Sequence, residues 1–291
     1  MKVLIGSAIL LGVIWWVFSC HKNSDTGPSF SKSPELFPVT TGVIDEASGI
    51  ADSYRNPGYL WVNQDSRQPT ELYLLSHKGK LAKKIFIKNV ANRDWEEVGV
   101  SNGPDAGKKY IYIGEVGDNV NAYSNYALYR FPEPASDVDT VDQVDKIAFI
   151  YPDGPHDCEA FFVEPVSKDI YLITKRDVPS KVYRLAYPQS INSMNTAEYI
   201  ADLPYNGVVA TAYSETKKEL LVKTYGNIYY YKHSSGQPIA DLVKKPQVTL
   251  SYQVEPQGEA MCFAIDDSGF FTLSEKGFAP YMNLNFYSRL R

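Results

Sequence analysis

Five stretches of this chain follow one pattern, and this repetition constrains the fold more than any other feature of the sequence. Each stretch has an apolar strand-like segment, a polar turn, a second such segment that ends in polar residues, and a third segment centred on Tyr. The units are headed by Glu46, Glu96, Glu159, Val209 and Glu259, at spacings of 50, 63, 50 and 50 residues. One more short apolar segment separates consecutive units, at 82–88, 146–151, 198–203 and 248–252. Four strands at a period of about 50 residues are typical of a propeller blade.

The last unit predicts how a ring of blades would close. The Tyr287 segment is followed only by residues up to Arg291, so the fifth blade lacks an outer strand of its own. Residues 36–43 form a strand-like segment before the first unit, and pairing it with the last blade would leave no open sheet edge. We therefore expect an all-β fold, a five-bladed β-propeller closed by an N-terminal strand, as a single domain over 36–291. A six-bladed propeller is the alternative, and it would need a unit that the sequence does not show.

The first nineteen residues are expected to form a lipoprotein signal peptide. Lys2 precedes an uninterrupted run of apolar and small residues from Val3 to Phe18, and Ser19 stands directly before Cys20. This ending resembles a lipobox, in which a small residue precedes a cysteine that is lipidated and becomes N-terminal after cleavage. The apolar run is shorter than the roughly 20 residues that a membrane-spanning helix needs, which argues against a signal anchor. We therefore expect lipidation of Cys20 and anchoring in the bacterial cell envelope, at the outer membrane.

Residues 20–35 are rich in Ser, Lys, Asn, Gly and Pro, a composition that predicts a flexible tether rather than a packed segment. The two remaining cysteines, Cys158 and Cys262, lie in apolar strand-like segments. Buried free thiols are expected there, and a disulfide between them is the alternative. The net charge of −5 provides no basic field for nucleic acid. We expect a monomer that contacts the membrane only through its lipid.

Polar residues recur at the positions that a propeller brings to one rim. The first strand of a blade runs away from that rim and the second returns to it, so the start of one and the end of the other meet around the channel. Four strand starts carry carboxylates, Glu46, Glu96, Glu159 and Glu259, and Val209 is the exception. The strand ends carry Asp65, Asp118, Asn119, Lys175, Arg176, Lys223, Glu275 and Lys276. We expect these residues to line a funnel that binds a small polar ligand or another envelope protein.

Four carboxylates at one channel mouth would repel one another and require compensation. A Ca²⁺ ion held by Glu46, Glu96, Glu159 and Glu259 is one possibility, because Ca²⁺ takes six to eight oxygen ligands. The neighbouring Lys and Arg side chains are another. In a third interpretation the glutamates are structural and hydrogen-bond the backbone of the next blade.

Four strings carry a resemblance to a known group of proteins. They are Asp94-Trp-Glu-Glu-Val, Gly114-Glu-Val-Gly-Asp-Asn119, Asp157-Cys-Glu-Ala and Pro256-Gln-Gly-Glu-Ala260. They resemble an uncharacterised family of bacterial secreted propellers. The chain is also distantly similar in style to the β-propeller phytases, whose acidic channel mouth holds Ca²⁺ and phosphate esters. It departs from those enzymes by placing Lys and Arg on the same rim.

Two classes of function remain open from the sequence. The first is an envelope lipoprotein whose funnel binds a small polar ligand or partner, with or without a divalent cation. The second is a metal-assisted hydrolase of phosphorylated or glycosidic substrates, in which paired carboxylates act as acid and base. The sequence contains neither a Gly-x-Ser-x-Gly elbow nor a phosphate-binding Walker loop, which favours binding over catalysis.

Overall fold

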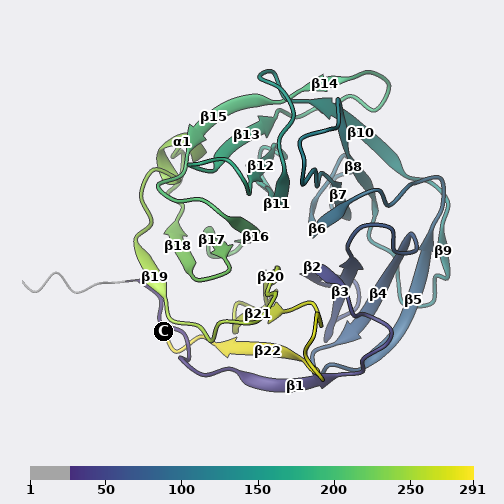
Figure 1. Ribbon diagram of the computed structural model, residues 1–291, viewed down its shortest axis with the longest axis vertical. Helices are drawn as coiled ribbons and strands as arrows, with labels where there is room; N and C mark the ends of the chain where they lie inside the picture. Colours follow the sequence, from purple (N-terminus) through teal and green to yellow (C-terminus); the bar gives the residue numbers. More distant parts are fainter. Residues whose placement is uncertain (1–26) are drawn as a thin grey trace, which may run out of the picture.

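Five sheets are arranged in a ring around a central axis in the computed structural model, which describes residues 27–291 (Figure 1). The innermost strands are β2 (Ala47–Asp52), β6 (Trp95–Asn102), β11 (Cys158–Val163), β16 (Val208–Ser214) and β20 (Ala260–Phe263). The second strands are β3 (Tyr59–Gln64), β7 (Lys109–Glu115), β12 (Ile170–Thr174), β17 (Glu219–Thr224) and β21 (Gly269–Leu273). The third strands are β4 (Glu71–Ser76), β8 (Tyr126–Pro132), β13 (Lys181–Leu185), β18 (Ile228–Lys232) and β22 (Met282–Ser288). We call the rim where the innermost strands begin the upper rim and the rim where they end the lower rim.

The outer strands complete the blades and close the ring. Blades 1 to 4 end with β5 (Leu81–Ile87), β10 (Asp145–Ile150), β15 (Glu198–Asp202) and β19 (Val248–Leu250). The fifth blade is completed by β1 (Glu35–Val39), which pairs antiparallel with β22 from Glu35 opposite Phe286 to Val39 opposite Met282. The predicted five-bladed propeller and its N-terminal closing strand are therefore confirmed, and the six-bladed alternative is wrong.

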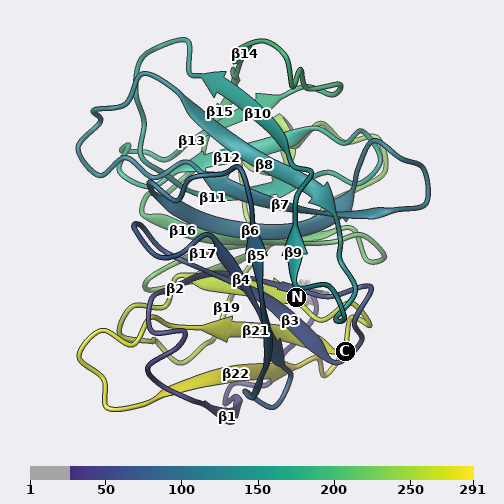
Figure 2. The ribbon, with the colours of Figure 1, turned by 90° about the vertical axis from the view of Figure 1, so that its right-hand side faces the viewer.

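Two additional strands and one short helix were not predicted. Strand β9 (Thr140–Val141) pairs in parallel with β5 at the outer edge of blade 1, where Figure 2 shows the two side by side. Strand β14 (Asn195–Thr196) extends blade 2 in the same way beside β10. Helix α1 (Ile239–Leu242) buries two of its four residues in the cluster between blades 3 and 4. These elements are too short for a periodic sequence pattern to reveal them.

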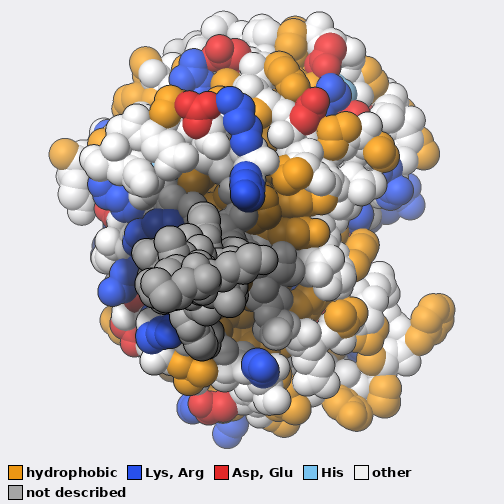
Figure 3. Space-filling view, turned by 90° about the vertical axis from the view of Figure 1, so that its left-hand side faces the viewer, with side chains coloured by type: hydrophobic (Ala, Val, Ile, Leu, Met, Phe, Trp, Pro, Cys, Tyr) orange, Lys and Arg blue, Asp and Glu red, His pale blue; other side chains and the backbone are white. Residues whose placement is uncertain are grey.

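The hydrophobic core consists of five clusters, one between each pair of neighbouring blades. In a strand, alternate side chains point to opposite faces, and each blade is covered on both faces, so its strands are apolar almost throughout. Trp61 and Trp95 fill the interface between blades 1 and 2 and are fully buried. Cys158 and Cys262 are buried free thiols, as expected. On the outer side at the left of Figure 1, basic and acidic side chains are interspersed (Figure 3).

The contacts of the propeller begin before the closing strand. Phe30 is only 8% exposed and packs edge-on against Phe270 of the fifth blade, with ring centroids 5.0 Å apart. The backbone of Ser31 donates to Ser288 at 2.8 Å, and Phe30 bridges to Arg289 at the lower end of β22. Part of the segment predicted as a flexible tether is therefore packed on the fifth blade.

The proposed signal peptide and Cys20 lie outside the described residues. Within 27–291, the structure contains no helix that is both long and apolar enough to cross a bilayer.

Candidate functional site

The pairing register shows which residues occupy equivalent positions at the upper rim. In blade 1, Ala47 pairs with Gln64 and Gly49 with Asn63, so Ser48 is an extra, bulged residue. The same bulge occurs at Glu159 in blade 3 and at Val209 in blade 4. In blade 2, Trp95 pairs with Glu115 as Ala47 pairs with Gln64, so the next residue, Glu96, takes the bulge position.

This register corrects the expected alignment of Glu46 with the other three glutamates. The residue equivalent to Glu96 is Ser48, and Glu46 lies two positions earlier in the strand, where blade 2 has Asp94 and blade 3 has Asp157. The backbone confirms the offset, because the carbonyls of Glu46, Asp94 and Asp157 each accept a hydrogen bond from the residue that follows the second strand. Because side chains alternate along a strand, only an alignment at this level shows which carboxylates meet.

The closest group of carboxylates consists of Asp65, Asp94 and Glu96, from blades 1 and 2. One carboxylate oxygen of each lies within 4.8 Å of those of the other two. Glu96 is 3% exposed and accepts a hydrogen bond from the Ser48 hydroxyl at 3.0 Å. Gly117 lies directly against Glu96 and Asp94, and a Cβ at this position would collide with both carboxylates. The glycine of the Gly-Asp-Asn string is thus required by this close approach.

Glu159, Glu259 and Glu275 continue the acidic lining around the channel. The Lys175 ammonium lies 2.8 Å from Glu159 Oε1 and 3.3 Å from Glu259 Oε1, so it bridges blades 3 and 5. The Tyr225 hydroxyl also donates to Glu259. With the preceding three residues, this gives six carboxyl groups around one bridging ammonium. We call these six residues and Lys175 the upper cluster.

Burial and mutual repulsion raise the pKa values of the upper cluster. Burial, followed by the charges of Asp65, Asp157 and Glu115, raises the pKa of Asp94 to about 6. Burial and the nearby Glu259, Asp65 and Glu46 raise the pKa of Glu275 to about 9. Burial also raises the pKa of Glu96 well above its usual value, and Glu159 adds to this shift. At neutral pH the upper cluster therefore holds protons that a divalent cation would displace.

Several residues expected in the funnel have structural contacts instead. Asp118 is fully buried and accepts hydrogen bonds from the backbone of Ala122 and Tyr123 and from the Tyr126 hydroxyl. Lys223 is also fully buried and donates to the carbonyl of Gly258, at the start of the next blade. Both side chains form hydrogen bonds with backbone groups.

The other expected residues lie at the margin of the funnel. Arg176 pairs with Asp157 at 2.6 Å and contacts the exposed Asn119. Lys276 pairs with Asp45 at 3.3 Å, next to the partly exposed Glu46. These residues surround the upper cluster without joining its centre.

Sequence reasoning missed Glu97, which closes the channel below the upper cluster. The Glu97 side chain reaches from blade 2 to blade 4, where the backbone of Thr211 donates to its Oε2 at 2.8 Å. Its Oε1 is buried without a hydrogen-bond partner. The equivalent residues of the other blades are small and leave room for this side chain; they are Gly49, Ala160, Ala210 and Ala260. One glutamate among four Gly or Ala residues at one repeat position was the signal that could have revealed it.

Comparisons with known proteins support the fold. No protein-family model matches the chain, and no curated protein matches it in sequence. Among solved structures, it is similar to an auxiliary nutrient binding protein from Bacteroides thetaiotaomicron, with a TM-score of 0.51, 8% identity, and coverage of 91% of this chain and 74% of that one. The PQQ-bound aldose sugar dehydrogenase from Streptomyces coelicolor gives a TM-score of 0.50 and 12% identity over 86% of this chain and 80% of that one. The Dos1 propeller gives a TM-score of 0.39 and 10% identity over 83% of this chain and 68% of that one. At these identities the likeness is one of fold, and the chain is a β-propeller.

Proposed function

We propose that the upper cluster binds Ca²⁺ and that the bound ion holds a small polar ligand in the funnel. The convergence of Asp65, Asp94 and Glu96 within 4.8 Å carries this proposal. Carboxylate oxygens are the ligands that Ca²⁺ prefers, and three of them leave coordination positions for water or for a ligand. Glu159 and Glu259 lie farther around the channel and are neutralised in part by Lys175. Glu46 is not part of the proposed ion site.

The structure favours a metal site over a purely structural network at these residues. A structural carboxylate accepts hydrogen bonds from backbone N–H groups, as Glu115 does from Arg93 and Asp94. Glu96 instead accepts one hydroxyl, and it faces Asp65 and Asp94. Three carboxylates that face one another gain most from a shared cation.

Calcium binding can be tested by thermal unfolding with and without Ca²⁺. We expect the parent to be stabilised by about 3 kcal/mol at a Ca²⁺ concentration about 100 times Kd, which corresponds to about 5–10 °C. Replacing Asp94→Asn together with Glu96→Gln should abolish this increment. Asp137→Asn with Asp139→Asn is the matched control, because it removes the same charge from an exposed loop.

Two outcomes would contradict the proposal. A parent whose melting temperature ignores Ca²⁺, Mg²⁺ and Mn²⁺ would exclude the metal site. A double variant that loses stability without metal, combined with a parent that ignores Ca²⁺, would assign the carboxylates a structural role.

Calcium-dependent turnover of a simple phosphate ester, abolished by a chelator, would favour the hydrolase over the binding protein.

We further propose that the protein is a monomeric envelope lipoprotein anchored through Cys20, and that it belongs to the secreted propeller family that it resembles. The described chain begins at Gly27 beside β19 and joins the fifth blade at the lower end of β22. Gly27 is the seventh residue after Cys20, and seven residues reach at most about 25 Å. The funnel opens at the opposite, upper rim. Replacing Cys20→Ala should shift the protein from the membrane fraction and change its mass, and unchanged partitioning and mass would remove this proposal.

A further inference from the structure

A concave site lies at the lower rim, on the far side of Glu97 from the upper cluster. Its walls come from the lower halves of the innermost strands and include Ile50, Val98, Phe161, Ala212, Met261 and Cys262. The empty space is about 750 Å³, counted out to open solvent. The part of it open to the centres of water-sized molecules is about 80 Å³, several times the roughly 10–15 Å³ that a single water needs. We call it the lower pocket. Thr211 lines it and also donates to Glu97, so Glu97 separates the lower pocket from the upper cluster.

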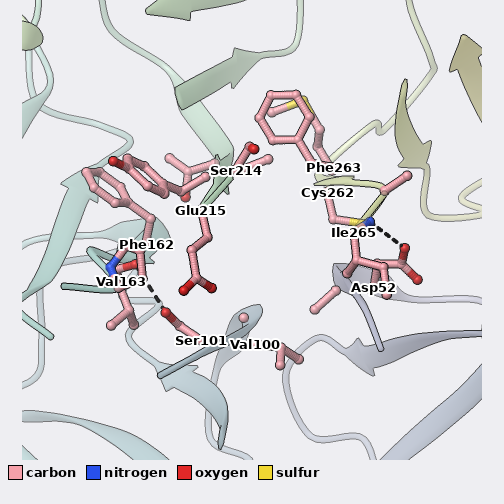
Figure 4. Close-up of a pocket in the computed structure, with 18 of the residues that line it drawn as sticks. Asp52, Val100, Ser101, Phe162, Val163, Ser214, Glu215, Cys262, Phe263 and Ile265 are labelled. Atoms are coloured by element: carbon pink, nitrogen blue, oxygen red, sulfur yellow. Dashed lines mark hydrogen bonds between the residues drawn. The ribbon is translucent and has the colours of Figure 1, made fainter. Parts of the chain in front are cut away.

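The mouth of the lower pocket is acidic and aromatic. Its ionisable lining consists of Asp52, Glu215, Asp267, Tyr54, Tyr213 and Cys262, and among the described residues it includes no Lys, Arg or His. His77, which is not part of this lining, pairs with Asp52 at 2.7 Å. Figure 4 shows the Glu215 carboxylate projecting into the middle of the opening. Burial and the charges of Glu215, Asp267 and Asp52 raise the pKa of Tyr54 to about 12. A negative potential therefore covers an otherwise apolar cavity.

An ammonium group of the protein itself already contacts the mouth of the lower pocket. The Lys109 ammonium binds the Glu215 carboxylate and lies 4.4 Å from the centre of the Tyr54 ring. A carboxylate and an aromatic face together are a favourable environment for an ammonium group. Asp267 accepts hydrogen bonds from the hydroxyls of Ser214 and Thr216, and no Lys or Arg side chain within residues 27–291 lies at ion-pair distance from its carboxylate.

We propose that the lower pocket binds an organic cation, with an ammonium group at the acidic mouth and an apolar body in the cavity. An anion would be repelled by the lining carboxylates, and a neutral alcohol could offer them a hydrogen bond but no opposite charge. The site is separate from the upper cluster in position and in chemistry, because Glu97 lies between the two and the carboxylates of the upper cluster are bordered by Lys175, Arg176 and Lys276.

The test uses three probes of similar shape and different charge. They are phenethylamine, 2-phenylethanol and 3-phenylpropionate, titrated against the full chain by ligand-observed NMR. We expect saturable binding of the amine only. Glu215→Gln should weaken the amine roughly tenfold, and Lys109→Met, which removes the internal competitor, should strengthen it by a similar factor. Both side chains are partly exposed, so neither change should prevent folding.

A funnel variant separates this inference from the proposed function. Asp94→Asn with Glu96→Gln should leave amine affinity unchanged, and both lower-pocket variants should keep the calcium response of the parent. The inference is overturned if the amine does not saturate, if the alcohol binds equally well, or if Glu215→Gln and Lys109→Met do not move the affinity in opposite directions.

Discussion

Lys175 offers the sharpest perturbation of the upper cluster, because its removal should have opposite effects with and without calcium. Its ammonium lies 2.8 Å from Glu159 and 3.3 Å from Glu259, and its side chain is only 14% exposed. Although burial lowers it, these two carboxylates hold the pKa of Lys175 above its usual value. Removing one partner of a buried ion pair costs about 3–5 kcal/mol. Protonation of the carboxylates would offset part of this cost, so we expect Lys175→Met to destabilise the calcium-free protein by about 2–3 kcal/mol.

Calcium should reverse this loss. A unit charge near an ion at a partly buried site is worth on the order of 1–4 kcal/mol. Without the lysine, Ca²⁺ affinity should therefore rise by about tenfold or more. Thermal unfolding should show a midpoint lower by about 5–10 °C without Ca²⁺ and a larger calcium increment than in the parent. Lys276→Met, at the margin of the funnel, is the control and should change both quantities little. If Lys175→Met leaves both unchanged, the ammonium does not balance the cluster and the reasoning is wrong.

Three further predictions concern the pH dependence of the upper cluster and the packing of Phe30. Calcium affinity should increase from pH 6 to pH 9, because Asp94 and Glu275 have pKa values raised to about 6 and about 9. The proton release that accompanies calcium binding can be measured by calorimetry in buffers of different ionisation enthalpy. In the calcium-free protein the same groups bind protons more tightly when folded than when unfolded, so stability should fall as pH rises through this window, and a rise would contradict the assignment. Phe30→Ala should cost about 2–4 kcal/mol in denaturant unfolding, since Phe30 is buried, whereas the fully exposed Phe278→Ala should cost almost nothing. Equal losses in the two variants would mean that residue 30 does not pack on the fifth blade.

The ring of blades was predictable because it rests on repetition. Five similar units, with 36–43 left over at one end, determined the blade number and the closure without any knowledge of contacts. The bounds of the outer strands were also predicted to within a few residues, as in β15 at Glu198–Asp202. Phe30 was not predicted, because a single aromatic residue in a polar segment has no periodic pattern, and its burial depends on the position of Phe270 and Arg289.

The site was predictable only in part, because the length of the repeat differs between units. Counting back from Glu96 by the 50-residue spacing of the other units matched it with Glu46, although Ser48 occupies the equivalent position. A difference of two residues leaves the alternation of side chains in a strand unchanged, so the sequence pattern does not reveal it. The same counting gave no reason to select Asp94. Charged side chains at strand ends also predicted Asp118 and Lys223 as ligands, although both are spent on backbone contacts.

The bulge in blade 2 also explains how one strand contributes to two different sites. Glu96 and Glu97 are consecutive, and together they stand opposite Gly114, so the usual alternation of side chains is interrupted at this point. Glu96 joins the upper cluster, while Glu97 spans the channel to Thr211 one level below.

Glu97 is held by two hydrogen bonds from Thr211, and the small residues at its repeat position surround it. The structure shows Glu97 in a single arrangement, so it offers no alternative state that a calcium ion at Glu96 could stabilise. Allosteric coupling between the two sites would require such an alternative state. We expect the two sites to bind independently, with a coupling below about 0.5 kcal/mol. Reciprocity makes this expectation testable from either side, because calcium would change amine affinity by the same factor as the amine changes calcium affinity.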